Sequence, residues 1–435
     1  MFNKIMINIK HIALLTLFLL TSFILIGCND IEGVFSDKKT KEPPKVDEKK
    51  DELLKEEPEE THFRITAVGD IMVHGPQIRA QFNAENNNYN FDNNFTFVKP
   101  YFKQSDILIG NLETTFAGED RGYSGYPMFN APDELAKTLS KKGFDYIVTA
   151  NNHSIDKGKQ GLKRTVDILE KNNLKAVGTR KNLENPGYYV ENINGVNVGI
   201  TAFTYETPLI HGHRSLNGII MDEELSQLVD SFSYQNLEEE VLNIKNRIKK
   251  LKDLGAELTI VYMHWGNEYQ TYPSMEQKKV ANKLANFGVD IIFGSHPHVI
   301  QPFDIIKSND AQHETLVFYS LGNFISNQRL KYLDTRLTEK GIIVNIDLKE
   351  VEGEISYEEI TYTPTWVHKY QYDGQVNYEI LPLPDVLNNQ KLYNLPTQKE
   401  AVAANAKLNT KDKITEINNN LFLEPVLEEE KIKIE

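Results

Sequence analysis

The chain has 435 residues, 40% of them hydrophobic, and a formal net charge of −14. This length suits one large domain or two modest ones, and the acidic balance does not favour a nucleic-acid binder, which usually carries a basic patch. Cys28 is the only cysteine, so an intrachain disulfide and a thiolate metal site are both excluded. Any metal ligands must therefore come from His, Asp, Glu and Asn.

The first 28 residues have the pattern of an export signal. Two lysines precede an almost wholly apolar run from residue 12 to 26, which is short for a membrane-spanning helix and suits the core of a signal peptide. The run ends in Leu25-Ile26-Gly27-Cys28, the form of a lipobox, in which the cysteine thiol receives a diacylglyceryl group. We expect residues 1–28 to be a lipoprotein signal peptide and the protein to be extracytoplasmic, anchored to the cell membrane by a lipid on Cys28. The alternative is an uncleaved N-terminal anchor with an incidental cysteine.

A charged segment separates this signal from the body. Residues 29–61 mix both signs of charge, contain several prolines and have few large apolar residues, so they cannot bury enough surface to offset their chain entropy. We expect a disordered tether here, a folded domain over residues 62–370, and a partly disordered C-terminal extension over residues 371–435.

Short apolar runs and amphipathic stretches alternate along the body. Runs of buried-strand type, most of them followed by a polar residue or glycine, lie at 63–70, 106–113, 144–153, 258–264, 291–296 and 316–319. Helical patterns lie between several of them, at 132–142, 161–172, 237–254 and 275–287. This alternation predicts an α/β fold whose functional groups lie at strand ends. Two later runs, 341–348 and 355–363, predict a small antiparallel β extension towards the C-terminus.

Polar side chains gather directly after five of these strands. They are Asp70 and His74, Asn111 and Glu113, Asn152, His153 and Asp156, His264 and Glu268, and His296 and His298. Because the ends of strands in one sheet face one crevice, we expect these groups to converge. Imidazole and carboxylate ligands suit Zn, Mn or Fe, and two such ions about 3.5–4 Å apart can share a carboxylate and activate a bridging water. A single His or Asp at a strand end is more often a turn or capping residue, so the prediction of two divalent metal ions depends on the ordered set.

The order of these residues is similar to that of the calcineurin-like metallophosphoesterases, and their local sequences resemble the CapA family of poly-γ-glutamate capsule proteins. The motifs that carry the resemblance are Val68-Gly69-Asp70-Ile71-Met72, Gly110-Asn111-Leu112-Glu113-Thr114, Ala150-Asn151-Asn152-His153-Ser154, Met263-His264-Trp265-Gly266, Gly294-Ser295-His296-Pro297-His298 and Ser320-Leu321-Gly322-Asn323-Phe324. They cover about residues 63–330 and are specific as an ordered set. The resemblance implies a four-layer α/β/β/α sandwich.

The resemblance also implies roles for individual residues. Seven would be metal ligands: Asp70, His74 and His298 on one ion, Asn152, His264 and His296 on the other, and Glu113 bridging the two. His153 would be the catalytic group, donating a proton to a leaving group or polarising the scissile oxygen. We further expect three residues to line the crevice and bind substrate: Asn111, Glu268 and Asn323.

Three departures separate this chain from the phosphoesterase pattern. Asp70 and His74 are four positions apart, where the pattern has them two apart. Glu113 stands in the place of the usual bridging aspartate, and Ser154 follows the Asn-His pair where a carboxylate is normal. Phosphoesterase activity is therefore an analogy that the ligand positions do not by themselves establish.

Three functions are compatible with these residues. The first is a capsule protein that makes, exports or anchors poly-γ-glutamate, its metals acting as a hydrolase or transferase on the polymer or an intermediate. The second is an extracytoplasmic metallophosphoesterase with a small cell-envelope substrate. The third is a non-catalytic, metal-bearing scaffold that assists the membrane subunits of a capsule synthase. The complete ligand set favours the first two, and the departures favour the first over the second.

An anionic polymer and an acidic protein repel each other unless metals or a local basic cluster draw the polymer in. The candidates for such a cluster are Arg79, Arg121, Lys157, Lys159, Lys163 and Arg164. The Gly- and Tyr-rich loop at 118–126 is a candidate flap over the crevice.

Overall fold

Two β-sheets lie at the centre of the protein. The computed structural model describes residues 60–393, 395–415 and 427–428. The predicted signal peptide, Cys28 and the tether up to residue 59 lie outside the described residues. The expected start of the folded domain at residue 62 is close to the first described strand, which begins at Glu60. No helix among the described residues is both long enough and apolar enough to cross a membrane.

The first sheet has the strand order β20-β19-β18-β1-β4-β5-β6. Its parallel half consists of β1 (Glu60–Ile71), β4 (Ile107–Leu112), β5 (Tyr146–Val148) and β6 (Lys175–Val177). Its antiparallel half consists of β18 (Lys340–Val351), β19 (Glu354–Tyr372) and β20 (Gln375–Pro382). Two short strands join off this path, β17 (Asn323–Ile325) beside β1 and β21 (Leu427–Glu428) beside β19.

The second sheet has the order β12-β8-β13-β14-β16-β15. Its strands are β8 (Val196–Tyr205), β12 (Ser231–Phe232), β13 (Leu258–His264), β14 (Ile291–Ser295), β15 (Phe303–Lys307) and β16 (Glu314–Phe318), with β7 (Tyr189–Ile193) added beside β8. Strands β8, β13, β14 and β16 are mutually parallel. The parallel parts of both sheets therefore each have an edge where carboxyl ends of strands come together.

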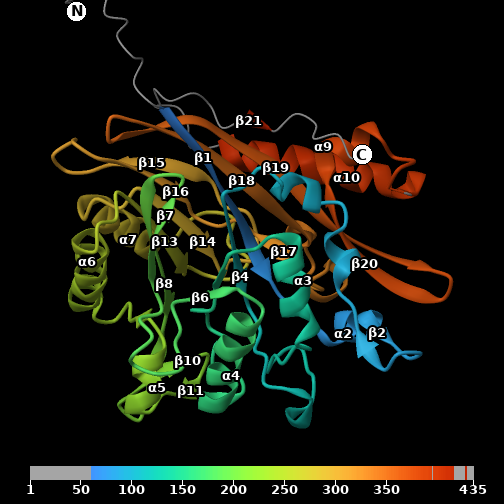
Figure 1. Ribbon diagram of the computed structural model, residues 1–435. Coiled ribbons are helices and arrows are strands. Elements are labelled where there is room, and N and C mark those ends of the chain that lie inside the picture. The colour runs from blue at the N-terminus through green and yellow to red at the C-terminus, as the bar shows by residue number, and fades with distance from the viewer. Residues whose placement is uncertain (1–59, 394, 416–426, 429–435) are drawn as a thin grey trace, which may run out of the picture. The chain divides into compact units, whose positions relative to one another are not determined.

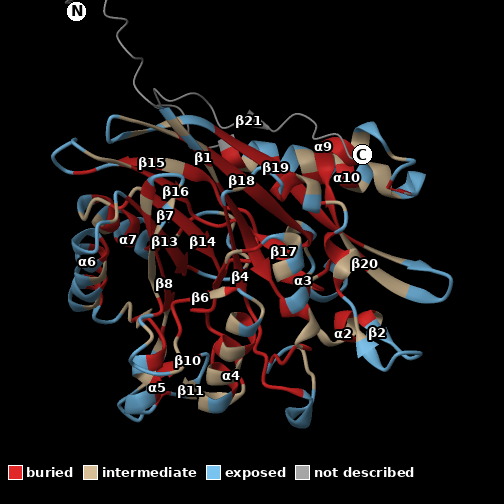
Figure 2. Cartoon of the chain, in the orientation of Figure 1, coloured by how far each residue is buried: buried red, intermediate tan, exposed pale blue. Residues whose placement is uncertain are grey.

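Three apolar layers hold the sheets and helices together. One buried cluster takes side chains from both sheets, such as Ile65, Ile109, Ile260 and Phe293, and is the layer between them. A second joins the other face of the first sheet to α3 (Glu134–Lys142) and α4 (Gly158–Lys171). A third joins the other face of the second sheet to α6 (Leu237–Asp253) and α7 (Met275–Asn286). The four-layer α/β/β/α sandwich is thus confirmed (Figures 1 and 2).

The remaining elements surround these layers. They are α2 (Gly75–Gln81), β2 (Phe82–Asn83), β3 (Asn88–Tyr89), η1 (Asp92–Phe95), η2 (Lys99–Phe102), η3 (Glu119–Arg121), β9 (Thr207–Ile210), β10 (His213–Leu216), β11 (Ile219–Ile220), α5 (Glu223–Leu228), α8 (Leu330–Leu333), η4 (Leu337–Glu339), α9 (Leu383–Asn388) and α10 (Thr397–Thr415). In Figure 1, α5, β10 and β11 lie beside α4, and the apolar contacts of Leu162 with Leu216 and Leu225 hold them there.

Local sequence explains why the four main helices form where the sequence predicts them. In α7, for example, the Ser274 hydroxyl accepts from the backbone N–H of Gln277, and the Gln277 side chain accepts from the backbone N–H of Ser274. This reciprocal capping box satisfies two amides at the helix start. The apolar positions Val280, Ala281 and Leu284 then face the second sheet.

The predicted antiparallel extension is present, but it is part of the first sheet and does not form a separate small sheet. Strands β18 and β19 contain the predicted runs, and β18 pairs with β1 along its length, so they enlarge the first sheet. Described residues beyond 370 form the end of β19, then β20, α9 and α10, whose apolar side chains pack around Trp366 and Tyr393. Strand β8, which lies between β12 and β13 in the second sheet, was not among the predicted strands.

Gly69 shows how closely the strands approach at the edge that carries the polar residues. The β1–β4 register shifts between Val68 and Asp70, and the backbone N–H of Asp70 donates to Gly322 O at 3.0 Å. A Cβ atom on residue 69 would lie 1.9 Å from Gly322 O, so any other residue would push β1 and β17 apart. This glycine in the Val68-Gly69-Asp70 motif is therefore required by packing.

Candidate metal centre

The predicted strand-end residues converge where the two sheets meet. Asp70 ends β1 and Glu113 follows β4, both in the first sheet, while His264 ends β13 and His298 follows β14 in the second. His298 Nδ1 lies 3.0 Å from Asp70 Oδ2. Likewise, His264 Nε2 lies 3.0 Å from Oδ1 of Asn152, which follows β5. Each contact joins one sheet to the other, so the centre exists only when both sheets are packed.

Two groups of ligand atoms in this cluster could each hold a metal ion. One contains Glu113, His296 and His298, and the other contains Asp70, Glu113 and His264. Within each group the atoms lie within 4.8 Å of one another, and every side chain is buried. Glu113 belongs to both groups, which is the position expected of a bridging ligand.

Glu113 is the observation that best fits a bound cation. Its side chain is fully buried, and neither carboxylate oxygen has a hydrogen-bond partner. Oε1 lies 3.7 Å from His298 Nε2 and 3.9 Å from His264 Nε2, too far for a good hydrogen bond. A buried acceptor without a donor is costly in a protein interior, and a divalent ion is a partner that these oxygens can coordinate.

The electrostatics of His264 and His296 agree with a site that binds a cation. Burial, followed by the charge of His296, holds the pKa of His264 well below its usual value. Burial and His298 do the same to the pKa of His296. Burial also opposes charge on His298, but the carboxylates of Glu113 and Asp70 outweigh it and raise its pKa to about 9. Neutral imidazoles offer a nitrogen lone pair to a metal, and the His296 Nδ1 atom has no hydrogen-bond partner.

The segment from Gly294 to His298 carries backbone strain. His296 has φ +94° and His298 has φ +57°, values that side chains with a Cβ rarely adopt. Each such residue costs about 1–3 kcal/mol, and such residues gather at functional sites. The strained turn directs two imidazoles at the same cluster, with ring centroids 5.9 Å apart.

His74 lies at the rim of the centre. It is the N-cap of α2, and it belongs to neither group of mutually close His, Asp and Glu atoms among the described residues. Its Nδ1 lies 3.3 Å from Gln77 Oε1 and accepts from the backbone N–H of Asn327 at 3.3 Å. The four-residue spacing explains this position, because β1 ends at Ile71 and the chain must turn before α2 begins. Its role as a ligand remains a prediction.

His153 forms a buried pair with Asp156. Its Nδ1 lies 2.8 Å from Asp156 Oδ2, and that oxygen also accepts from the backbone N–H of Phe129 at 2.6 Å. The Phe129 ring packs edge-on against His153, with centroids 4.7 Å apart. These contacts fix the imidazole so that Nε2 is the nitrogen available to the pocket that His153 lines.

A pocket of about 590 Å³ opens beside the cluster. Its wall includes His74, His153 and His298 from the predicted site. Glu268, expected to bind substrate, also lines it and is exposed. Aromatic and amide side chains contribute much of the remaining wall, namely Tyr126, Phe129, Tyr269, Tyr332, Asn327 and Gln328, together with Met72, Pro76 and Leu333. No lysine or arginine is among the described residues that line it.

Two residues expected at the crevice wall are instead fully buried. Asn111 Nδ2 donates to Asp70 Oδ1 at 2.8 Å, and its Oδ1 accepts from Asn151 Nδ2 at 3.1 Å. Asn323 Nδ2 donates to Gln328 Oε1 and to Thr338 O at 2.8 and 2.9 Å. Neither lines the pocket, because both amides hold neighbouring segments together behind it. Their expected role in binding substrate stays a prediction, and the contacts that the structure shows for them are supporting ones.

Three contributors to the site were not predicted as site residues. The Tyr205 ring packs against His296, with centroids 4.6 Å apart, Phe129 supports His153, and Asn327 lines the pocket. Tyr205 ends β8, a strand end of the predicted kind. Phe129 and Asn327 lie in loops with no motif, so local sequence carries no signal for them.

Three of the six residues in the predicted basic cluster are paired with carboxylates of the protein itself. Lys159 and Lys163 both pair with Glu224, at 2.7 and 2.9 Å, and Arg164 pairs with Asp133 at 2.7 Å. Arg121 donates to the backbone carbonyl of Lys157 at 3.2 Å. These ion pairs reduce the free positive charge at this surface.

The layers and the histidine–carboxylate cluster at the strand ends define a calcineurin-like α/β/β/α domain. A search of families matches residues 64–328 to the bacterial capsule synthesis protein family PGA_cap, and the chain belongs to this family.

Two relatives similar in sequence are named as capsule or PGA biosynthesis proteins. The chain is 32% identical over 282 residues to the capsule biosynthesis protein CapA of Bacillus anthracis, covering 62% of this chain and 61% of that protein. It is 28% identical over 295 residues to the PGA biosynthesis protein CapA of Bacillus subtilis, covering 66% and 67%. Among solved structures, the calcineurin-like phosphoesterase YfkN from Bacillus subtilis is similar, with 14% identity, a TM-score of 0.38, and coverage of 70% of this chain and 91% of that one.

Proposed function

We propose that this protein acts in the formation of a poly-γ-glutamate capsule at the outer face of the cell membrane, through a site for two divalent metal ions. The observation that carries the proposal is Glu113, a buried carboxylate of the first sheet that has no hydrogen-bond donor and lies among three histidines of the second sheet. Family membership supports the link to capsule synthesis. Export, a lipid on Cys28 and contact with membrane synthase subunits are parts of the proposal that rest on the sequence.

The chain's own residues have distinct parts in this chemistry. Two divalent ions, when bound, supply an activated water and polarise an oxygen of the scissile group. His153 holds a proton on the nitrogen that faces the pocket and delivers it to the leaving group. Asp156 orients that imidazole through Nδ1. The aromatic wall around Phe129 and Tyr269 excludes water from the reacting group.

The charge of the pocket wall limits the length of an anionic polymer that can enter the pocket. A run of glutamate carboxylates would lie against a wall that has aromatic rings and Glu268 but no lysine or arginine among its described residues. Like charges repel at such distances. We therefore propose that one terminal unit of the polymer, or one small intermediate, enters the pocket with an oxygen towards the metals.

Asn327 is suited to hold such an oxygen. Its side-chain Oδ1 accepts from Lys369 Nζ at 3.0 Å and from the Tyr378 hydroxyl at 2.7 Å. Because an ammonium group can only donate, this contact determines which end of the amide is the oxygen. The Nδ2 end is then left to donate towards substrate in the pocket.

An Asn327→Ala variant is expected to bind a fluorescent γ-linked glutamate oligomer about tenfold more weakly, since a lost hydrogen bond costs about 0.5–1.5 kcal/mol. Fluorescence anisotropy on metal-loaded protein measures the affinity, and elemental analysis checks that metal content is unchanged. The matched control is Asn377→Ala on the exposed end of β20, which should bind like wild type. Equal affinity in all three proteins would count against a substrate contact.

Elemental analysis of the full-length protein and a His296→Ala variant tests the metal site. We expect about two equivalents of transition metal in the wild type and fewer in the variant, because His296 is a ligand in one group.

In cells that make the capsule polymer, the His296→Ala variant should have less polymer on the surface. A Cys28→Ser variant should move the protein out of the membrane fraction. Wild-type protein that takes up no metal would remove the proposed mechanism. Normal amounts of polymer in cells whose variant protein binds no metal would favour the third function, a non-catalytic scaffold.

A further inference from the structure

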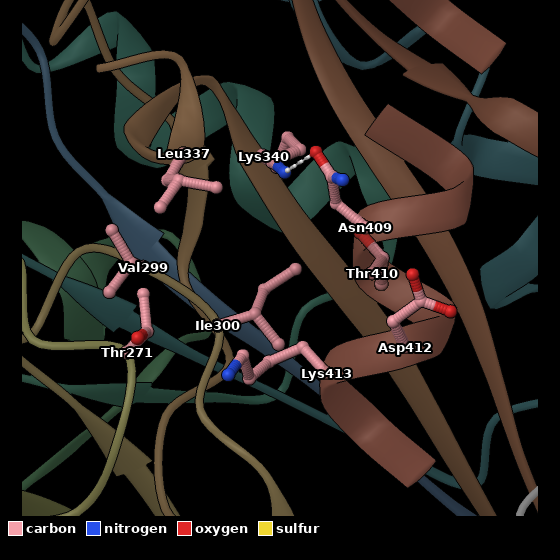
Figure 3. Close-up of a pocket in the computed structure, with 9 residues that line it drawn as sticks. All are labelled: Thr271, Val299, Ile300, Leu337, Lys340, Asn409, Thr410, Asp412 and Lys413. Carbon is pink, nitrogen blue, oxygen red and sulfur yellow. Dashed lines mark hydrogen bonds between the residues drawn. The ribbon is translucent and has the colours of Figure 1, made fainter. Parts of the chain in front are cut away.

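A second cavity, of about 330 Å³, lies between α10 and the body of the protein. Figure 3 shows Val299, Ile300 and Leu337 on one side and Asn409 and Lys413 of α10 on the other, with Lys340 between them. The cavity shares no lining residue with the pocket beside the metal centre. It is therefore separate from the site already assigned.

Lys340 is the unusual group in this cavity. Lys340 is buried, with only 5% of the residue exposed to solvent. Its Nζ donates to Asn409 Oδ1 at 3.3 Å. Within the part of the chain that is described, no carboxylate lies within ion-pair distance of this ammonium. The neighbouring Glu339 is engaged elsewhere, with Trp366 Nε1 at 3.2 Å and with Arg329 and Arg336 at 3.4 Å each.

A buried ammonium with one long hydrogen bond is energetically unfavourable. An ammonium has three donors, and a buried charge costs several kcal/mol unless it is paired and hydrogen-bonded. Burial accordingly lowers the pKa of Lys340 to about 8, which still leaves the group mostly charged at neutral pH. An anion in the cavity would supply the missing acceptors.

The remaining walls indicate what kind of anion fits. Val299, Ile300 and Leu337 present aliphatic surface, which suits a hydrocarbon body better than a strongly hydrated inorganic ion. Lys413, whose Nζ lies 3.8 Å from the Tyr272 ring centroid, adds positive charge to the same cavity. Asp412 also lines the cavity, but Figure 3 shows its carboxylate pointing away from Val299 and Ile300.

We propose that this cavity is a binding site for a small aliphatic carboxylate. Its oxygens accept from the Lys340 ammonium, and its hydrocarbon body packs against Val299, Ile300 and Leu337. The site depends on α10, because Asn409 and Lys413 both come from that helix. It does not depend on the metal chemistry proposed above.

Butyrate is the probe for this site, measured by saturation-transfer NMR on full-length, metal-loaded protein. We expect saturable binding to wild type, with the strongest transfer to the methyl group. Lys340→Met should weaken it at least tenfold, and the matched control Lys307→Met, on the exposed end of β15, should bind like wild type. Because the variant removes a buried charge, it should unfold at the same or a higher temperature without butyrate.

Each other outcome contradicts a definite part of the proposal. No saturable binding to wild type, or equal binding to Lys340→Met with its fold intact by circular dichroism, would overturn the site. Displacement of butyrate by equimolar inorganic phosphate would overturn the choice of a carboxylate. Metal content measured in the same samples separates these results from a failure of the metal centre, since Lys340→Met should retain its metals.

Discussion

A Glu113→Gln variant is expected to lose both metal ions and, in the presence of chelator, to be at least as stable as the wild type. Glutamine has nearly the same shape but cannot bridge two cations as a carboxylate does. With metal at one hundred times its dissociation constant, the wild type gains about 2.7 kcal/mol of stability from binding, which the variant lacks. Without metal, the wild type retains a buried carboxylate that has no donor, and the variant does not. Urea unfolding with metal and with EDTA measures both differences.

The reversal of order between the two conditions is the informative result. A residue with only a structural role would change stability in the same direction with and without metal. Glu268→Gln is the matched control, because Glu268 lines the pocket but is exposed and outside both ligand groups. It should keep its metal and unfold like the wild type in both conditions. A Glu113→Gln protein with full metal content would show that Glu113 is not a ligand.

Replacing His153 by glutamine is expected to reduce turnover by about 10²–10⁴-fold while leaving the metal content unchanged, because general acid–base groups contribute rates of this size. His153 is outside both ligand groups but lines the pocket beside them. Release of p-nitrophenol from bis(p-nitrophenyl) phosphate and shortening of a γ-linked glutamate oligomer are the two assays. Which substrate the wild type turns over also distinguishes a phosphoesterase from an enzyme of the polymer.

Asp156→Asn is the companion variant, and it separates orientation from proton transfer. In the wild type, one charged carboxylate oxygen of Asp156 contacts both the backbone N–H of Phe129 and His153 Nδ1. The amide of the variant keeps one oxygen that can accept from either group, but this oxygen does not carry the charge of the carboxylate. We expect a smaller loss than in His153→Gln, with the optimum of the pH–rate profile displaced, and little change in binding. Full activity of His153→Gln on every substrate that the wild type uses would exclude His153 as the catalytic acid.

The structure narrows the functions that the sequence left open. A pocket walled largely by aromatic rings, beside the candidate metal ligands and without a lysine or arginine among its described residues, suits one unit of a substrate better than a continuous polyanion. The ion pairs of Lys159, Lys163 and Arg164 reduce the positive charge of the surface that a long polymer was expected to follow. The metals and Asn327 are then the groups left to attract an oxyanion.

Sequence alone determined the elements and the chemical character of the centre. Helices α3, α4, α6 and α7 occur where amphipathic stretches predict them, because that signal is local. The rule that parallel strands present their carboxyl ends at one edge groups Asp70 with Glu113 in the first sheet and His264 with His298 in the second, but the two pairs meet only because the sheets pack together. The α/β/β/α fold and membership of the capsule synthesis family are confirmed on that basis.

Tertiary structure alone decided which of these residues face substrate. Asn111 lies in β4 and Asn323 begins β17, and their amides are held by Asp70 of β1 and by the carbonyl of Thr338. Asn327 has no motif, and its orientation depends on Lys369 and Tyr378, more than forty positions away in the chain. Lys340 lies in a strand that the sequence places correctly, but only the packing of α10 leaves its ammonium in a cavity. The direction of a side chain depends on the segments packed around it, and those are brought together only by the fold.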